Sequence, residues 1–126
     1  MKRLIIAVVD DCGIGEFFRA VICDEGHVFQ GFITAESFLE EVNELKPDLV
    51  LLDLMLPGID GMECLHRLRQ MPSMRRCPVV VVTALNDAAK RHETQQLGAL
   101  DYILKPDLFD QLPQLLASLA EESLES

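Results

Sequence analysis

The stretch DLVLLDLMLPGIDG, at residues 48–61, decides the fold of this chain. Residues 48–52 are almost continuously apolar, which is typical of a short strand that is buried on both faces. The Pro-Gly pair at 57–58 and the Asp-Gly pair at 60–61 favour a loop and the start of a new element. The strand therefore ends at Asp53, at the edge of a parallel sheet where ligands bind. Such an aspartate either takes part in chemistry or only caps the next helix, and the rest of the chain decides between these interpretations.

Short apolar segments and amphipathic segments alternate along the chain. Strands are predicted at residues 4–9, 27–33, 48–53, 78–82 and 100–104, and helices at residues 14–23, 34–45, 61–71, 86–97 and from about residue 110 onward. Five strand-helix units in a row predict an α/β fold: a single doubly wound, five-stranded parallel sheet of the flavodoxin-like type, with helices on both faces. The helix at 86–97 carries few apolar residues, so we expect it to bury little and to be held weakly. Pro113 is expected in the first turn of the last helix, where no hydrogen bond is lost.

Length and composition describe one soluble globular domain. The chain has 126 residues, of which 49% are hydrophobic and 25% are charged. It is therefore large enough to bury a core without stabilising disulfides or structural metals. We expect one domain at residues 1–126, with its core at about residues 3–120 and an acidic tail at residues 121–126 that frays. The four cysteines show no C-x-x-C spacing, and they are predicted to pack in the core of a protein from a reducing compartment.

Charge and hydropathy exclude two classes of partner. The net charge of -10 argues against direct nucleic-acid binding by this domain, because phosphate contacts require a basic face. No segment approaches the ~20 consecutive apolar residues needed to span a bilayer, and no cleavage signal follows the first residues. We therefore expect a cytoplasmic protein that does not contact membranes.

Polar side chains follow four of the predicted strands at the same edge of the sheet: Asp10, Asp11, Asp53, Thr83 and Lys105. Three carboxylates repel one another, and a hard divalent cation with oxygen ligands, most simply Mg²⁺, relieves that repulsion. Asp53 could then act as a nucleophile on phosphorus, because phosphoryl transfer depends mainly on positioning and charge stabilisation. Thr83 and Lys105 would supply a hydroxyl donor and a cation to the phosphoryl oxygens. Each residue alone could be structural, but five of them at four strand ends favour phosphoryl chemistry.

With these motifs the chain resembles the receiver domain of response regulators in two-component phosphorelays. The motifs are VVDD, LLDLMLPGIDG, VVVTA and DYILKP, in the order and spacing of that family, and the resemblance covers residues 3 to about 120. It implies the strand order 2-1-3-4-5. It also implies that Asp53 accepts a phosphoryl group from a histidine kinase or a histidine phosphotransfer protein.

The same resemblance assigns roles to the other residues of the site. The implied ligands of Mg²⁺ are Asp10, Asp11, Asp53 and the backbone carbonyl of Met55. Thr83 and Lys105 are implied to bind the phosphoryl oxygens, and Tyr102 is implied to swing inward when Thr83 moves. The peptide bond that leads into Pro106 is expected to be cis.

The resemblance implies that the chain is a signalling switch and not a turnover enzyme. Such a switch catalyses only its own phosphorylation and dephosphorylation. Its output is expected on the face formed by the helix at 86–97, the last strand and the last helix, which would control an output domain or a partner protein, or form a homodimer. By the same resemblance, the side chains of Met55 and Leu85 are implied to border the path of the water that attacks the aspartyl phosphate. Neither side chain holds a water well, so slow loss of phosphate is expected. Residues 107–108 are an apparent insertion, which leaves the start of the last helix open.

Three other functions share parts of this pattern. A flavodoxin-type flavin binder needs a hydroxyl- and glycine-rich phosphate loop after the first strand, where Asp10 and Asp11 would repel a phosphate. A phosphatase with an aspartate nucleophile needs a second carboxylate two residues later, and Met55 occupies that position. A receiver-like interaction module that is not phosphorylated stays open as the alternative, although the complete set of site residues argues against it.

Overall fold

Five strands form one parallel sheet in the computed structural model, which describes residues 3–11 and 15–125, with side chains as far as residue 121. The strands are β1 (Ile5–Val9), β2 (Val28–Phe32), β3 (Leu49–Leu52), β4 (Val79–Thr83) and β5 (Asp101–Leu104). They lie in the order β2-β1-β3-β4-β5, and every neighbouring pair is parallel. The predicted fold class and strand order are therefore confirmed.

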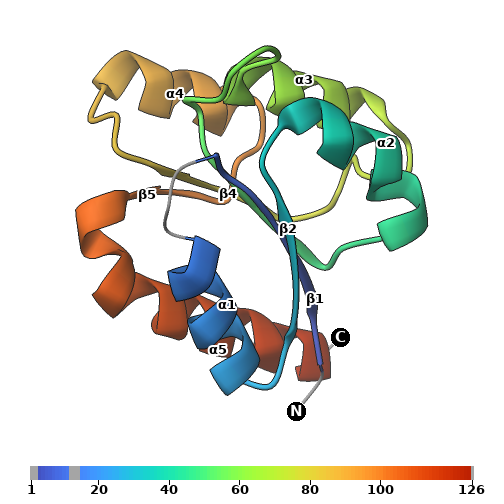
Figure 1. Ribbon diagram of the computed structural model, residues 1–126, viewed down its shortest axis with the longest axis vertical. Helices are drawn as coiled ribbons and strands as arrows, with labels where there is room; N and C mark the ends of the chain where they lie inside the picture. Colours follow the sequence, from blue (N-terminus) through green and yellow to red (C-terminus); the bar gives the residue numbers. More distant parts are fainter. Residues whose placement is uncertain (1–2, 12–14, 126) are drawn as a thin grey trace.

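Helices cover both faces of the sheet (Figure 1). They are α1 (Gly15–Asp24), α2 (Ala35–Leu45), α3 (Gly61–Gln70), α4 (Ala88–Gln96), the short 3-10 helix η1 (Lys105–Asp107) and α5 (Leu108–Glu125). α1 and α5 lie on one face, and α2, α3 and α4 lie on the other. Because every crossover carries the chain back to the same end of the sheet, all the strands deliver their last residues to one edge. Residue 14, where we expected the first helix to begin, lies outside the described residues.

The strands bury apolar side chains on both faces of the sheet, in alternation. On one face, Ile6, Val8, Leu49 and Leu51 pack with Phe18, Ile22, Leu112 and Leu116 of α1 and α5. On the other face, Ala7, Val9, Val50 and Leu52 pack with Phe38, Val42, Leu65 and Leu68 of α2 and α3. β3 is buried at every position, as its continuous apolar pattern predicted.

Side-chain caps begin the helices on the α2, α3 and α4 face. Thr34 Oγ1 accepts a hydrogen bond from the N–H of Ser37 at 3.1 Å, at the start of α2. Asp60 and Asp87 accept in the same way from the N–H three residues later, at 2.9 and 3.1 Å, at the starts of α3 and α4. Each such cap satisfies an N–H that the helix leaves unpaired and is worth about 1 kcal/mol.

α4 buries little, as its composition predicted. Thr94 is its one buried residue among those described. Arg69 of α3 fastens the end of α4, because its guanidinium donates to the carbonyls of Leu97 at 2.9 Å and of Gly98 at 3.1 Å. The same guanidinium also donates to three carbonyls in the loop before β4. Polar contacts therefore attach α4 more than a buried apolar face does.

The last helix begins earlier than predicted. α5 starts at Leu108 and not near Asp110, because Leu108 is buried and belongs to the apolar core. Pro113 consequently lies inside α5 and not in its first turn, so the carbonyl of Phe109 has no N–H four residues later. The backbone of the helix continues to Glu125, and the expectation that the tail frays stays a prediction.

Two further expectations are wrong. No peptide bond among the described residues is cis, so the Lys105–Pro106 bond is trans. Cys23 is exposed and does not pack in the core, whereas Cys64 is buried and Cys77 is half-buried. Cys12 lies outside the described residues. No helix in the described part of the chain has the length and apolar content needed to cross a bilayer.

Candidate functional site

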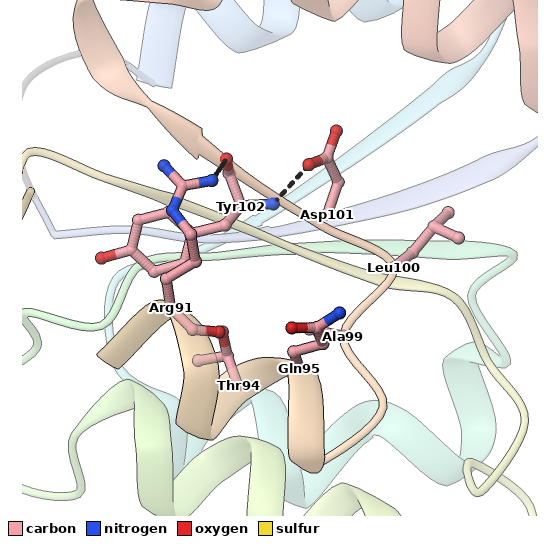
Figure 2. Close-up of a pocket in the computed structure, with 7 residues that line it drawn as sticks. All are labelled: Arg91, Thr94, Gln95, Ala99, Leu100, Asp101 and Tyr102. Carbon is pink, nitrogen blue, oxygen red and sulfur yellow. Dashed lines mark hydrogen bonds between the residues drawn. The ribbon is translucent and has the colours of Figure 1, made fainter. Parts of the chain in front are cut away.

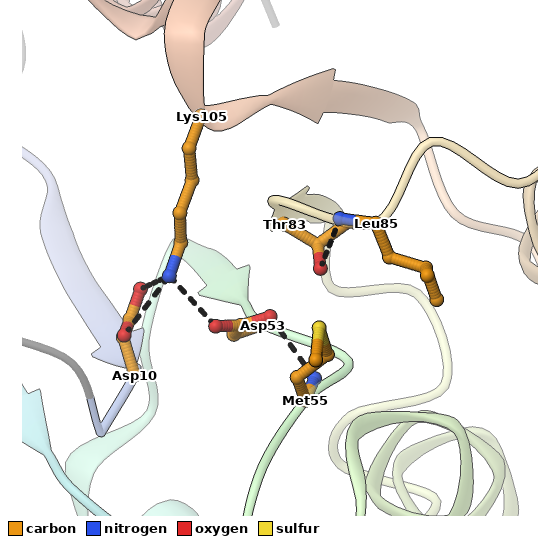
Figure 3. A network of polar contacts seen from close by, with 6 residues as sticks. All are labelled: Asp10, Asp53, Met55, Thr83, Leu85 and Lys105. Atoms are coloured by element: carbon orange, nitrogen blue, oxygen red, sulfur yellow. Dashed lines mark hydrogen bonds and ion pairs between the residues drawn. The ribbon is translucent and has the colours of Figure 1, made fainter.

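The predicted site residues gather at the carboxyl edge of the sheet (Figure 3). Asp10 and Asp11 follow β1, Asp53 follows β3, Thr83 closes β4 and Lys105 follows β5. The N–H of Asp10 and the N–H of Asp53 each continue the pairing of the strands, with a bond of 3.0 Å to a carbonyl of the neighbouring strand. The backbone of the sheet therefore determines where these two carboxylates lie.

Three carboxylates form a compact cluster. Asp10, Asp11 and Asp53 each offer an oxygen, and these oxygens all lie within 4.8 Å of one another. Asp53 is 3% exposed and Asp10 is 8% exposed, while Asp11 is open to solvent. Mg²⁺ prefers oxygen ligands and binds through one or two carboxylates together with waters. This donor set therefore suits the predicted ion.

Lys105 bridges two of these carboxylates. Its Nζ lies 2.8 Å from Asp53 Oδ2 and 3.1 Å from Asp10 Oδ2. The lysine side chain is 16% exposed and the two carboxylate side chains are less exposed still, so solvent screens these ion pairs less than it screens a surface pair. A cation in this place also stands next to any group that becomes attached to an oxygen of Asp53.

The loop after β3 supplies a second contact to Asp53. The N–H of Met55 donates to Asp53 Oδ1 at 3.0 Å, so each oxygen of this carboxylate has a donor. Gly61 begins α3 so close to this loop that a Cβ on it would lie 2.1 Å from the carbonyl oxygen of Asp53. Glycine is thus required for α3 to start beside the site; the sequence predicted a helix start at residue 61 but not this close contact. The role of the Met55 carbonyl as a metal ligand stays a prediction.

Thr83 and Tyr102 both bond to the backbone of Leu85. The N–H of Leu85 donates to Thr83 Oγ1 at 3.3 Å, and the hydroxyl of Tyr102 donates to the carbonyl of Leu85. Thr83 is 0% exposed and Tyr102 is 6% exposed, so the ring lies inside the domain. Burial raises the pKa of the Tyr102 phenol, an effect that Arg91 opposes and that nearby carboxylates reinforce.

Arg91 contacts the site residue Tyr102, and nothing in the sequence pointed to it. The guanidinium carbon of Arg91 lies 4.6 Å from the centroid of the Tyr102 ring, and one of its nitrogens donates to the carbonyl of Tyr102 at 3.4 Å. In the sequence Arg91 is one of many polar residues in a helix with few apolar ones. The spacing between the two residues carries no signal, because the contact depends on how α4 lies against β5.

Comparison with known proteins places this geometry in one family. A family model described as the response regulator receiver domain matches residues 5–117. The DNA-binding response regulator MtrA of Mycobacterium tuberculosis is 38% identical over 106 residues, which cover 84% of this chain and 45% of MtrA. The chain thus spans about half the length of the curated relatives that it matches.

Two solved structures extend the comparison to the fold. The BeF3-activated N-terminal receiver domain of RstA from Klebsiella pneumoniae is 33% identical, with a TM-score of 0.76 over 91% of this chain and 97% of that one. The Mn²⁺-bound form of the response regulator Rcp1 is 25% identical, with a TM-score of 0.79 over 89% of this chain and 91% of that one.

Proposed function

This chain belongs to the response regulator receiver domain family of two-component systems, and we propose that it is a phosphoacceptor switch in which Asp53 takes the phosphoryl group. The donor is the phosphohistidine of a histidine kinase or of a histidine phosphotransfer protein. The observation that carries the proposal is the Lys105 Nζ at 2.8 Å from Asp53 Oδ2, beside three clustered carboxylates. An aspartate that only caps a helix needs neither a nearly buried cation nor two further carboxylates.

The proposed reaction is a nucleophilic transfer to a carboxylate. An oxygen of Asp53 attacks the phosphorus of the phosphohistidine; an O–P bond forms, the P–N bond breaks, and the imidazole leaves with the electron pair of that bond. Lys105 stabilises the charge that builds on the equatorial phosphoryl oxygens. Thr83 contributes its hydroxyl once that group, which now accepts from the N–H of Leu85, turns toward the phosphoryl group. Water later hydrolyses the aspartyl phosphate and returns the domain to its starting state.

Mg²⁺ is the cofactor of this proposal, held by Asp10, Asp11, Asp53 and the backbone carbonyl of Met55. When bound, it supplies positive charge that offsets the carboxylates and the phosphoryl oxygens. Lys105 brings one positive charge against the three carboxylates of the cluster, so the residues alone leave the site negative. The likeness to Rcp1, whose structure is a Mn²⁺-bound form, supports a divalent ion in this place.

Labelling with acetyl phosphate, a small phosphodonor, tests the proposal by mass spectrometry of the intact protein. The wild type should gain one phosphoryl group with Mg²⁺ present and none in chelator. Asp53→Asn should gain none, whereas the matched control Asp107→Asn, which changes an exposed aspartate, should label like the wild type. Equal labelling of Asp53→Asn, or full labelling in chelator, contradicts the assignment. A wild type that takes no label would favour an interaction module that is not phosphorylated.

The proposed output is a change of the face formed by α4, β5 and α5, which a partner protein, an output domain or a second copy of the chain reads. The thin burial of α4 supports this choice, because switches draw on weakly packed elements. DNA binding is part of the name of MtrA, a protein about twice as long, and we propose that this acidic domain does not bind nucleic acid itself. Hydrogen exchange with and without beryllofluoride, a phosphoryl mimic, should differ most at residues 85–104. A difference confined to residues 14–43 would rule this face out.

A further inference from the structure

Arg91 and Tyr102 form a stacked pair between α4 and β5 (Figure 2). The guanidinium carbon lies 4.6 Å from the ring centroid, and the guanidinium also donates to the carbonyl of Tyr102 at 3.4 Å. A guanidinium over an aromatic face is attracted by the electrons of the ring, and its flat shape lets it stack there. Arg91 therefore contacts both the side chain and the backbone of Tyr102.

The other described residues of α4 include few apolar side chains that could cover the tyrosine. Ala88 and Ala89 are exposed, and Thr94 uses its hydroxyl to donate to the carbonyl of Arg91 at 2.9 Å. Toward the core, Tyr102 belongs to a small apolar cluster with residues of β4 and of the loop after β3. On α4, the contact of Arg91 with the ring is therefore the one that we expect to hold the tyrosine in place.

A short series of contacts connects this pair to the phosphoryl site. The hydroxyl of Tyr102 donates to the carbonyl of Leu85, and the N–H of Leu85 donates to Thr83 Oγ1 at 3.3 Å. Because Leu85 carries both bonds, the position of the ring and the position of the threonine are coupled through one residue. A residue that fixes Tyr102 therefore also biases the segment on which Thr83 lies.

We propose that Arg91 is a positioning residue that holds Tyr102 inward before any phosphoryl group is present, so that the domain begins partly biased toward its signalling conformation. This deepens the proposed function and rests on it, since it concerns the regulation of the same site. A contact made only in the inward state shifts the equilibrium by its own free energy, which phosphorylation then does not need to supply. A cation–π contact at a partly exposed site corresponds to about a two- to fivefold change in the ratio of inward to outward tyrosine.

Space beside the pair gives the ring room to move. A cavity of about 180 Å³ opens between α4 and β5, and both Arg91 and Tyr102 line it, together with Gln95 and Leu100. Removal of the arginine side chain would widen this space on the side of the ring that it now covers. An arginine that only stabilises α4 would leave the ring in place when removed. The exposure of Tyr102 therefore distinguishes the two roles.

Tyr102 is its own probe, because the chain contains 1 tyrosine and 0 tryptophans. Acrylamide quenching of the tyrosine fluorescence, without phosphodonor, measures how accessible the ring is. Arg91→Ala should raise the quenching constant about twofold. Lys90→Ala removes the same charge from the neighbouring position of α4 and should leave the constant unchanged. Arg91→Lys keeps the charge but not the flat guanidinium, so its value should lie between those of the wild type and Arg91→Ala.

The remaining measurements separate this proposal from the phosphorylation chemistry. In an Asp53→Asn background the effect of Arg91→Ala on quenching should persist, whether or not Asp53 is the acceptor. In the Asp53 protein, beryllofluoride with Mg²⁺ should return the tyrosine of Arg91→Ala to the wild-type level of quenching, because the mimic supplies the missing bias. Equal quenching of wild type and Arg91→Ala, or an equal rise in Lys90→Ala, overturns the role of Arg91. If circular dichroism shows that Arg91→Ala does not fold, the comparison of Arg91→Lys with the wild type decides instead.

Discussion

Two parts of the domain hold their helices by different interactions: α1 and α5 on one face of the sheet, and α4 on the other. α1 and α5 bury apolar side chains that are 0% exposed: Phe18, Ile22, Leu112 and Leu116. On the opposite face, α4 buries Thr94 alone among its described residues. Arginines connect α4 to its surroundings instead, since Arg69 bonds the two carbonyls that follow the helix and Arg91 contacts Tyr102.

This difference distinguishes a scaffold from a movable part. Apolar burial contributes about 25 cal/mol per Å² of buried surface and has no preferred direction. A helix that packs in this way therefore detaches only when its apolar side chains become exposed to water. A hydrogen bond or a cation–π contact contributes about 1 kcal/mol net and can be exchanged for another at small cost. Substitutions of side chains that α1 buries should therefore lower the free energy of unfolding of the whole domain. Substitutions around α4 should mainly reduce the local stability of α4 and the residues next to it.

The largest effect is expected for Phe18→Ala, on the scaffold side. Phe18 is 0% exposed, and its removal leaves a cavity between α1, α5 and the strands, which should lower the free energy of unfolding by about 3–5 kcal/mol. Urea denaturation measures that loss. Phe109→Ala, at a phenylalanine that is 77% exposed, is the matched control and should cost less than about 1 kcal/mol. Equal losses at the two positions would contradict the description of this face as the scaffold.

The next effect is expected for Arg69→Met, which removes the guanidinium behind α4. Several charge-assisted bonds to carbonyls are lost, so the free energy of unfolding should fall by about 2 kcal/mol. Hydrogen exchange should show that residues 97–104 lose protection before α1 does. Arg67→Met is the control, because Arg67 pairs with Glu63 at a solvated site, and it should cost less than about 0.5 kcal/mol. Uniform loss of protection in Arg69→Met would mean that α4 and the scaffold unfold as one unit.

The scaffold and the position of the site could be predicted because both follow from periodicity. Alternating apolar and amphipathic segments specify strands and helices, and the side of the sheet at which a strand ends specifies where Asp53 and Lys105 lie. The carboxylate cluster and its contact with the lysine are direct results of that placement. Most of these strand ends are marked in the sequence by an abrupt change from apolar to charged residues.

The attachment of α4 could not be predicted in the same way. Arg69 bonds carbonyls that lie 28 and 29 residues further along the chain, and every residue has a carbonyl, so no residue type marks the partner. The start of α5 was predicted wrongly for a related reason. Pro113 suggested a later start, but tertiary packing buries Leu108 and extends the helix toward β5. Local sequence therefore does not predict contacts to backbone carbonyls or helix boundaries that depend on tertiary packing.

A smaller effect, on the rate at which phosphate is released, is expected for two side chains on the loops after β3 and β4. Met55 and Leu85 lie on the loops beside Asp53 and Thr83, and neither apolar side chain can hold a water in line with the O–P bond of an aspartyl phosphate (Figure 3). Met55→Asn combined with Leu85→Glu should speed the release of phosphate about tenfold, which corresponds to roughly 1.4 kcal/mol of barrier. The rate is measured after labelling with acetyl phosphate and removal of the donor. An unchanged rate, or a wild type that loses its phosphate within seconds, shows that these side chains do not set the lifetime.

The smallest effect is expected for pH, and it should fall on the scaffold side. His27 is buried before β2, and its Nδ1 accepts a hydrogen bond from the N–H of Leu4 at 3.0 Å, which requires that this nitrogen carry no proton. Burial lowers the pKa of His27 below its ordinary value of 6.5, although Glu25 and Asp48 oppose this. Below pH 6.5 His27 therefore binds more protons in the unfolded chain than in the folded chain, so the contribution of His27 to stability is complete above this pH and is lost as the pH falls below it.

A substitution that keeps the acceptor but cannot titrate isolates this contribution. In His27→Asn the side-chain oxygen can accept from the N–H of Leu4, so the stability of this variant should depend less on pH than that of the wild type between about pH 7.5 and about pH 5.5. Urea denaturation at each pH gives the two slopes. Hydrogen exchange in acid should show wild-type protection falling first at β1 and β2, next to the bond from Leu4 to His27, and not at α4. Identical slopes in the two proteins would mean that His27 carries no part of the pH dependence. An early loss at α4 would instead mean that a titrating group other than His27 governs the response to acid, because the guanidinium contacts of Arg69 and Arg91 do not titrate in this range.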